Sequence, residues 1–392
     1  MYHMRIQERK GICLIVTLAM CFLAGCGGTG TPKAVEVVEN TLSADLLEAM
    51  QKKEEETKPE PEEAQEDEVV TFTISCAGDC SLGNHKDQDY SYSFRQMYDS
   101  KKDPGYFLGN VRDIFAADDL TIVNLEGALT LSEQYRPNRT YNIKGDPEYV
   151  QILTEGSVEA VSMGNNHRAD YGAEGVRDTI EALESVHIAY AYDDNIGYFE
   201  KEGIRVGFLS VNEASDGKRV EAFITDGMDT LKEEGVDLIL VCCHWGTEKD
   251  NYPETYQQEL GRKCIDLGAD LVIGHHPHVL QGIEEYQGKY ILYSLGNFCF
   301  GANRNPSDKD TMIFQQTFTF VNGEKQEETE IKIIPCRVSS VNERNDYCPT
   351  PVTGQEAERI LERVRAFSEP FGTAFSNGLL LFESFVSKIR EE

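Results

Sequence analysis

The alternation of short apolar runs with amphipathic stretches across residues 69–279 is the feature that most constrains the fold of this chain. Runs such as 120–127 and 203–213 have the length of buried strands. Stretches such as 106–119 and 173–186 carry helical periodicity. Because strands that alternate with helices of about ten or more residues are typical of βαβ units, the sequence predicts an α/β fold with a largely parallel sheet.

After residue 279 the helical pattern stops and strand-like segments follow. Residues 287–300, 311–321 and 328–338 have the composition of antiparallel strands. We expect them to form a second sheet that packs on the first. A last helix is expected near residues 354–367.

The N-terminal residues resemble the leader of a bacterial lipoprotein. Basic side chains precede an apolar run at residues 11–25 that is too short for a comfortable membrane span. The run ends in the letters LAGC, which resemble a lipobox, in which the chain is cut before the cysteine and the cysteine is acylated. An ordinary signal peptide or an uncleaved anchor are the alternatives. We expect residues 1–25 to be a signal peptide and Cys26 to anchor the protein on the extracytoplasmic face of the cell membrane.

Residues 26–69 are expected to be a disordered acidic tether. Residues 51–68 have almost no apolar content and cannot bury enough surface to offset the ordering of their backbone. The chain has a formal net charge of −31, and most of this excess lies outside the tether. Nucleic acid is therefore not an expected partner, since binding it requires basic surface. An anionic substrate would require cations within its site.

The eleven cysteines do not indicate a disulfide framework. Three of them, including Cys26, belong to the leader and lipobox. The other eight lie mostly within apolar, strand-like runs, and no CxxC pair indicates structural zinc. We expect these eight to be buried, reduced thiols.

Residues that can bind a metal or move a proton follow nearly every predicted strand. In an open α/β sheet, ligands collect at the carboxyl ends of the strands. Taken singly, each residue has a simpler explanation as a turn, cap, solvated-loop or core residue. Together they occur in topological order at five strand ends, which favours a single site. They are Asp79; Asn124 and Glu126; Asn165, Asn166 and His167; His244; and His275, His276 and His278.

Imidazole, carboxylate and amide groups are ligands for Zn, Mn or Fe. One or two such ions would activate a water molecule and bind a phosphoryl oxygen. In an extended segment, residues two apart point the same way, so His276 and His278 should enter one pocket while Pro277 stiffens the loop. His275 is expected to face away and to have a supporting or structural role. Asp170 is interpreted as a helix N-cap.

The ordered motifs GD, NLE, GNNH, HWG, GxHPH and SLGNF resemble those of the CapA/PgsA family of poly-γ-glutamate capsule-synthesis proteins. This family belongs to the calcineurin-like metallophosphoesterase superfamily. The resemblance covers roughly residues 71–300. It implies a metallophosphatase-like, two-sheet β-sandwich flanked by helices in four α/β/β/α layers, over residues 71–345. Residues 346–392 would be a helical and strand extension packed on that domain.

The resemblance also implies roles for individual residues. Ser81 stands where the superfamily has a histidine, so one of two metal positions would be weaker than the other. His167 would be the acid that protonates a leaving group. The implied metal ligands are Asp79, Glu126, Asn166, His244, His276 and His278. The implied substrate-binding residues are Asn124, Asn165, Lys144, Tyr141 and Asn297, of which Lys144 has a solvated-residue alternative and Asn297 a turn alternative.

Three functions are consistent with these features. The first is a metal-dependent hydrolase of a phosphoester or related bond in an anionic envelope polymer or its phosphorylated precursor. The second is a non-enzymatic accessory subunit of a poly-γ-glutamate synthase or exporter, which the serine at position 81 favours. The third, a solute-binding lipoprotein, fits the tether but does not require ligands at the strand ends.

Overall fold

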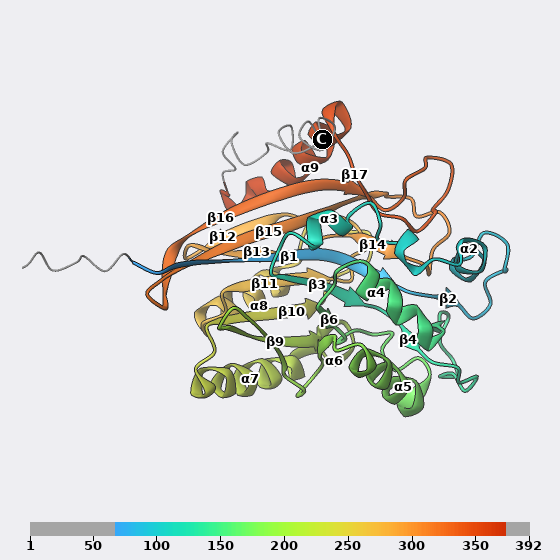
Figure 1. The fold of residues 1–392 in the computed structure, drawn as a ribbon, viewed down its shortest axis with the longest axis horizontal. Coiled ribbons are helices and arrows are strands. Elements are labelled where there is room, and N and C mark those ends of the chain that lie inside the picture. The colour runs from blue at the N-terminus through green and yellow to red at the C-terminus, as the bar shows by residue number, and fades with distance from the viewer. Residues whose placement is uncertain (1–66, 374–392) are drawn as a thin grey trace, which may run out of the picture. The chain divides into compact units, whose positions relative to one another are not determined.

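We analysed a computed structural model of the protein, which describes residues 67–373 (Figure 1). The expected signal peptide, the lipid-bearing Cys26, nearly all of the tether and the last residues of the C-terminal extension lie outside this range. Within residues 67–373, no helix combines the length and the apolar character that a membrane span requires.

The first sheet has eight strands in the order β17-β16-β15-β1-β3-β6-β7, with β14 also pairing with β1. Its β3, β6, β7 and β14 run parallel to β1, whereas β15, β16 and β17 add antiparallel strands at the other side of β1. The bounds are β1 (Val69–Ser81), β3 (Leu120–Leu125), β6 (Ala160–Ser162), β7 (Ala189–Ala191), β14 (Asn297–Phe300), β15 (Asp310–Val321), β16 (Glu324–Arg337) and β17 (Thr350–Pro351).

The second sheet has six strands in the order β12-β13-β11-β10-β9-β8. Its central strands β9, β10, β11 and β13 are parallel. The bounds are β8 (Gly197–Lys201), β9 (Ile204–Asn212), β10 (Leu238–His244), β11 (Leu271–His275), β12 (Ile283–Tyr286) and β13 (Lys289–Leu292). A small third sheet joins β2 (Asn84–His85), β5 (Ile143–Gly145) and β4 (Ala128–Leu129).

The expectation that the late strands form the second sheet is wrong. β15 and β16 form a hairpin that pairs with β1 and so enlarges the first sheet. β13 lies parallel to β11 in the second sheet, and β14 lies parallel to β1 in the first. The second sheet is instead built mainly from the βαβ units before residue 279. Local strand propensity does not specify which sheet edge a strand joins, because that choice depends on tertiary packing.

Helices cover the outer faces of both sheets, which gives the expected four-layer α/β architecture (Figure 1). The core between the sheets contains alternate residues of both, such as Ile74 and Ile122 facing Leu240 and Ile273. The helices are α2 (Phe94–Lys101), α3 (Arg112–Phe115), α4 (Gln151–Glu155), α5 (Gly172–Ser185), α6 (Glu213–Asp216), α7 (Val220–Glu234), α8 (Thr255–Asp266) and α9 (Gly354–Ser368).

The helix expected over residues 106–119 is reduced to the single turn of α3. Gly109 lies between a 3-10 turn at Pro104–Tyr106 and α3, and glycine is a poor helix former.

The eight cysteines within residues 67–373 are all buried and free, as expected. Burial raises the pKa of each shifted thiol, that of Cys242 to about 12. These thiols therefore behave as small apolar core residues and not as nucleophiles.

Candidate metal centre

Strand ends from both sheets meet at one edge of the sandwich. The first sheet contributes Asp79 from β1, which is in register with Asn124 of β3. The second contributes the last residues of β10 and β11, His244 and His275, which are also in register. At position 78, a Cβ would lie 2.0 Å from the carbonyl oxygen of Gly296. Glycine is therefore required beside Asp79, because β14 approaches the backbone closely there.

Asn124 connects the two buried carboxylates of the centre. Its Nδ2 donates to Asp79 Oδ1 at 2.8 Å and lies 3.3 Å from Glu126 Oε2. Asn165 supports it, since its Nδ2 donates to Asn124 Oδ1 at 3.1 Å and to the carbonyl of Leu125. Asp79, Asn124 and Glu126 have no exposed surface. Asn124 and Asn165 therefore hold the carboxylates in position from within the core.

His275 does not face away from the site, which corrects the sequence-based expectation. Its ring is buried, and Nδ1 lies 3.4 Å from Asp79 Oδ1. The second carboxylate oxygen of Asp79, Oδ2, lies 3.0 Å from His278 Nδ1. Burial alone would raise the pKa of Asp79, but these two imidazoles hold it well below its usual range. Asp79 is therefore a carboxylate.

His276 and His278 reach the same pocket, but not by the extended backbone that the spacing suggested. Their φ angles are 97° and 57°, in the left-handed region that non-glycine residues rarely adopt. Such strain is characteristic of functional sites, where the surrounding structure enforces it. Their ring centroids are 5.9 Å apart, and that of His276 is 4.6 Å from His244.

The three imidazoles differ in charge. Burial lowers the pKa of His276 to about 4, with a further contribution from His278, and lowers that of His244 well below its ordinary value. Burial acts in the same direction on His278, but Glu126 and Asp79 outweigh it and raise the pKa to about 9. Glu126 and Asp79 therefore favour a positive charge on His278, while His244 and His276 are neutral and able to bind a metal.

Asn166 lies against the imidazole side of the centre. Its Oδ1 accepts a hydrogen bond from His244 Nε2 at 3.1 Å. The contact brings the loop after β6, in the first sheet, to the end of β10 in the second.

His167 is paired with Asp170, a functional contact that the sequence interpretation missed. His167 Nδ1 donates to Asp170 Oδ2 at 2.7 Å, and its Nε2 lies 3.9 Å from Glu126 Oε1. Asp170 is fully buried and also accepts from the backbone N–H of Ile143. The N-cap interpretation is wrong, because Tyr171 occupies that position of α5. The spacing of three residues between His167 and Asp170 was the available signal.

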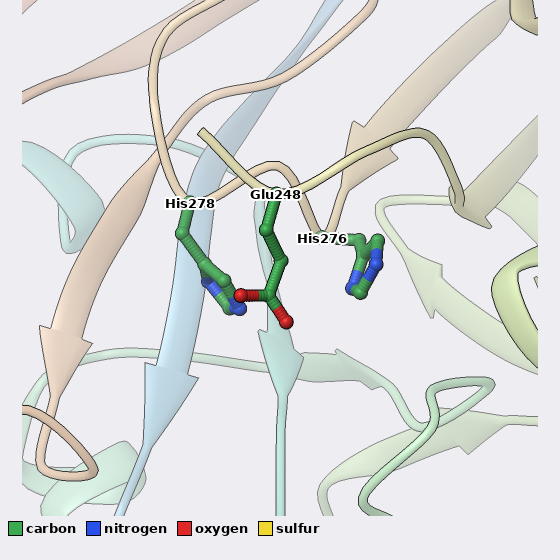
Figure 2. A group of neighbouring side chains, drawn as sticks. All are labelled: Glu248, His276 and His278. Carbon is green, nitrogen blue, oxygen red and sulfur yellow. The ribbon is translucent and has the colours of Figure 1, made fainter. Parts of the chain in front are cut away.

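Glu126 Oε1 and His276 Nδ1 are buried atoms of the centre without a hydrogen-bond partner, whereas Asp79 Oδ2 and His278 Nδ1 lie 3.0 Å from each other. Leaving such atoms unsatisfied is costly, and carboxylate and imidazole atoms are the ligands that divalent cations use. The side chains of the centre form two groups whose ligand atoms lie within 4.8 Å of one another: Asp79, Glu126 and His278; and Glu248, His276 and His278 (Figure 2). The residues present therefore fit a divalent cation.

A pocket of about 550 Å³ opens onto the centre. Glu126, His167 and His278 form part of its lining, together with two of the residues implied to bind substrate, Tyr141 and Asn297. Lys144 lies outside this lining. Its Nζ donates to Glu133 and to the carbonyl of Ser132, both at 2.7 Å.

A two-sheet α/β sandwich with carboxylates, amides and imidazoles at its shared strand edge defines a protein of the metallophosphoesterase-like superfamily. Within it, residues 73–302 match the family described as bacterial capsule synthesis protein PGA_cap. The chain belongs to this family.

Curated relatives agree with this assignment. The chain is 29% identical over 282 residues to the capsule biosynthesis protein CapA of Bacillus anthracis, covering 65% of each chain. It is 32% identical over 210 residues to the PGA biosynthesis protein CapA of Bacillus subtilis, covering 48% of this chain and 55% of the relative. The chain thus spans less than two thirds of the length of these relatives. A hypothetical protein of Thermus thermophilus is similar in structure, with a TM-score of 0.38, 16% identity and coverage of 67% of this chain and 99% of that one.

Proposed function

We propose that this protein is a lipid-anchored component of poly-γ-glutamate or related envelope-polymer biosynthesis that hydrolyses a phosphoester-type bond with a divalent metal. The observation that carries the proposal is the group of buried carboxylates and imidazoles whose ligand atoms converge beside the pocket, with Glu126 Oε1 and His276 Nδ1 lacking a hydrogen-bond partner. The names of the Bacillus relatives supply the biological setting.

The metal would be held by Asp79, Glu126, Asn166, His244, His276 and His278, and it would supply Lewis-acid activation of a water molecule and of the scissile group. His167 lines the same pocket, with Nδ1 bonded to Asp170 and Nε2 directed towards the centre. This arrangement fixes the tautomer and presents Nε2 for proton transfer to a leaving group. Asp170 is therefore a positioning residue.

The outer pocket suits an anionic substrate despite the acidic composition of the chain. Lys249 and Arg304 line it, and within residues 67–373 neither forms an ion pair with a carboxylate. Asp308, in the same lining, is neutralised by Arg363 at 2.7 Å. The loop that carries Arg304 is held by the buried Asn345, whose backbone N–H donates to the carbonyl of Arg304 at 3.0 Å. The pocket therefore places two cations that form no ion pair among the described residues beyond the metal centre.

Elemental analysis of the full chain, purified without chelator, tests the proposal first. We expect near-stoichiometric Mn, Zn or Fe, and turnover of bis(p-nitrophenyl) phosphate that ceases on chelation. Free metal at about 100 times its Kd should stabilise the fold by about 2.7 kcal/mol, measured as a rise in Tm. Absence of bound metal together with an unchanged Tm would reject the metal-dependent hydrolase.

Replacement of Arg304 by alanine should weaken binding of γ-glutamyl oligomers about 10- to 150-fold, since a hydrogen bond to a charged group contributes about 1.5–3 kcal/mol. Fluorescence anisotropy of labelled oligomers measures this, and the difference should shrink at high salt because exposed charges are screened. Arg177→Ala is the matched control, because among residues 67–373 Arg177 pairs only with Asp178 and Glu181 of its own helix α5. Equal affinity for both variants would remove Arg304 from the substrate site.

The second candidate is a non-enzymatic accessory subunit that uses this centre to hold polymer or metal. Ser81 favours it, since the Oγ that stands in place of a ligand histidine is buried without a hydrogen-bond partner. A relative from Mycobacterium tuberculosis, 26% identical over 211 residues, is described as a probable polyglutamine synthesis accessory protein. Association with synthase subunits follows from this candidate. Polymer binding without turnover of any phosphoester, with each divalent metal supplied, would favour it over hydrolysis.

A further inference from the structure

A backbone hydrogen bond holds the loop that carries Glu248 against the loop that carries His276 and His278. The residue follows β10 and is exposed. The adjacent Lys249 has a left-handed φ of 66°, and its backbone N–H donates to the carbonyl of Pro277 at 2.8 Å. Because Pro277 separates His276 from His278, this bond ties the position of Glu248 to that of both imidazoles.

The side chains of the two loops converge. The ligand atoms of Glu248, His276 and His278 all lie within 4.8 Å of one another, and Figure 2 shows the carboxylate between the two imidazole rings. His276 is only 8% exposed, and its Nδ1 is buried without a hydrogen-bond partner, whereas His278 Nδ1 lies 3.0 Å from Asp79 Oδ2. Glu248 thus reaches the unsatisfied imidazole of His276, with His278 beside it, from the solvent side of the centre.

We propose that Glu248 is a metal ligand that forms, with His276 and His278, a cation position on the outer side of the centre. Two imidazoles and one carboxylate are a ligand set that Zn, Mn and Fe accept. The ligands implied by the family resemblance do not include Glu248. The inference rests on the proposed function, because it concerns the same metal centre.

The carboxylate has a specific electrostatic effect at this position. The neighbouring donors His244 and His276 are imidazoles, which bind a metal in their neutral form. Asn166 contributes only an amide. A cation on this side would therefore retain its full charge next to neutral donors, and Glu248 supplies the negative charge that offsets it. The carboxylate of Glu248 lowers the free energy of the bound cation and decides how strongly the outer position retains it.

Isothermal titration of the full chain with Mn²⁺ and with Zn²⁺ tests this role through Glu248→Gln, which keeps the shape of the side chain and removes its charge. Loss of a supporting partner alone reduces metal affinity about 10- to 100-fold. We therefore expect at least a 10-fold loss of affinity or one fewer ion bound. Substitution with Co²⁺ should give a visible absorption band whose intensity and position differ between the variant and the wild type.

Glu259→Gln is the control, since this substitution makes the same change of charge on the exposed side of α8. It should bind metal as the wild type does. If the wild type binds metal and Glu248→Gln matches it in stoichiometry, affinity and Co²⁺ spectrum, Glu248 is not a ligand. The proposed metal centre would still be supported. If the wild type binds no metal, the proposed function fails first and this inference with it.

Discussion

Replacement of His276 by alanine should abolish metal binding and phosphoester turnover while the domain stays folded. The imidazole belongs to the ligand group with Glu248 and His278, and its Nδ1 has no hydrogen-bond partner whose loss would destabilise the fold. Since loss of a supporting partner alone reduces metal affinity about 10- to 100-fold, loss of the ligand should exceed about 100-fold. Elemental analysis and circular dichroism measure the two effects.

The contrast with a core variant makes this test decisive. Leu240 is fully buried between the two sheets, and Leu240→Ala should cost about 2–5 kcal/mol of unfolding free energy. His276→Ala should unfold at a denaturant concentration near that of the metal-free wild type. A loss of stability like that of Leu240→Ala, with metal retained by the folded fraction, would make His276 a structural residue.

Asp170→Asn should reduce kcat by a factor on the order of 100 to 10,000 and leave metal content unchanged. Asp170 Oδ2 accepts from His167 Nδ1 at 2.7 Å and from the backbone of Ile143 at 2.8 Å. An amide can present its NH₂ group to the ring and so select the other tautomer, with the proton on the wrong nitrogen. In serine proteases the analogous substitution lowers kcat by about 10,000-fold.

The pH profile of kcat separates positioning from a general structural effect. Loss of the Asp170 carboxylate should shift the limb of the pH profile that depends on His167. A general loss of order in the site would instead lower kcat by the same factor at every pH. Asp178→Asn, on α5, provides a comparison carboxylate, because Asp178 accepts a hydrogen bond from Thr130 and does not contact His167. An unchanged kcat for Asp170→Asn would remove the pair from the reaction.

The parts of the fold that the sequence predicted are those with strong local periodicity. The strands β3 and β9 and the helices α5 and α9 lie close to the expected ranges. The apolar residues of β9 are divided between the inter-sheet core and the outer core. The short strands β7 and β8 were not predicted, because a few residues carry too little pattern. The position of β15 and β16 depends on their hairpin pairing with β1, which is a tertiary choice.

The residues of the candidate site were also predicted in part from local pattern and in part depend on tertiary structure. The strand-end rule brought Asp79, Asn124 and His244 to one edge, since parallel strands end together. It could not anticipate the left-handed backbone at His276, which changes the directions of the neighbouring side chains. Asp170 was interpreted as an N-cap because it lies just before α5, although its spacing of three residues from His167 was present in the sequence.

The division of the centre between two sheets has a consequence for folding kinetics. Asp79 and Asn124 belong to the first sheet, whereas His244 and His275 belong to the second. The centre therefore forms only after the two sheets have docked, and a cation would bind late in folding. In the transition state the ligands of the two sheets are not yet together, so the cation would not stabilise that state. Such an interaction slows unfolding far more than it accelerates folding. A bound ion would thus act as a removable cross-link that lengthens the lifetime of the folded domain.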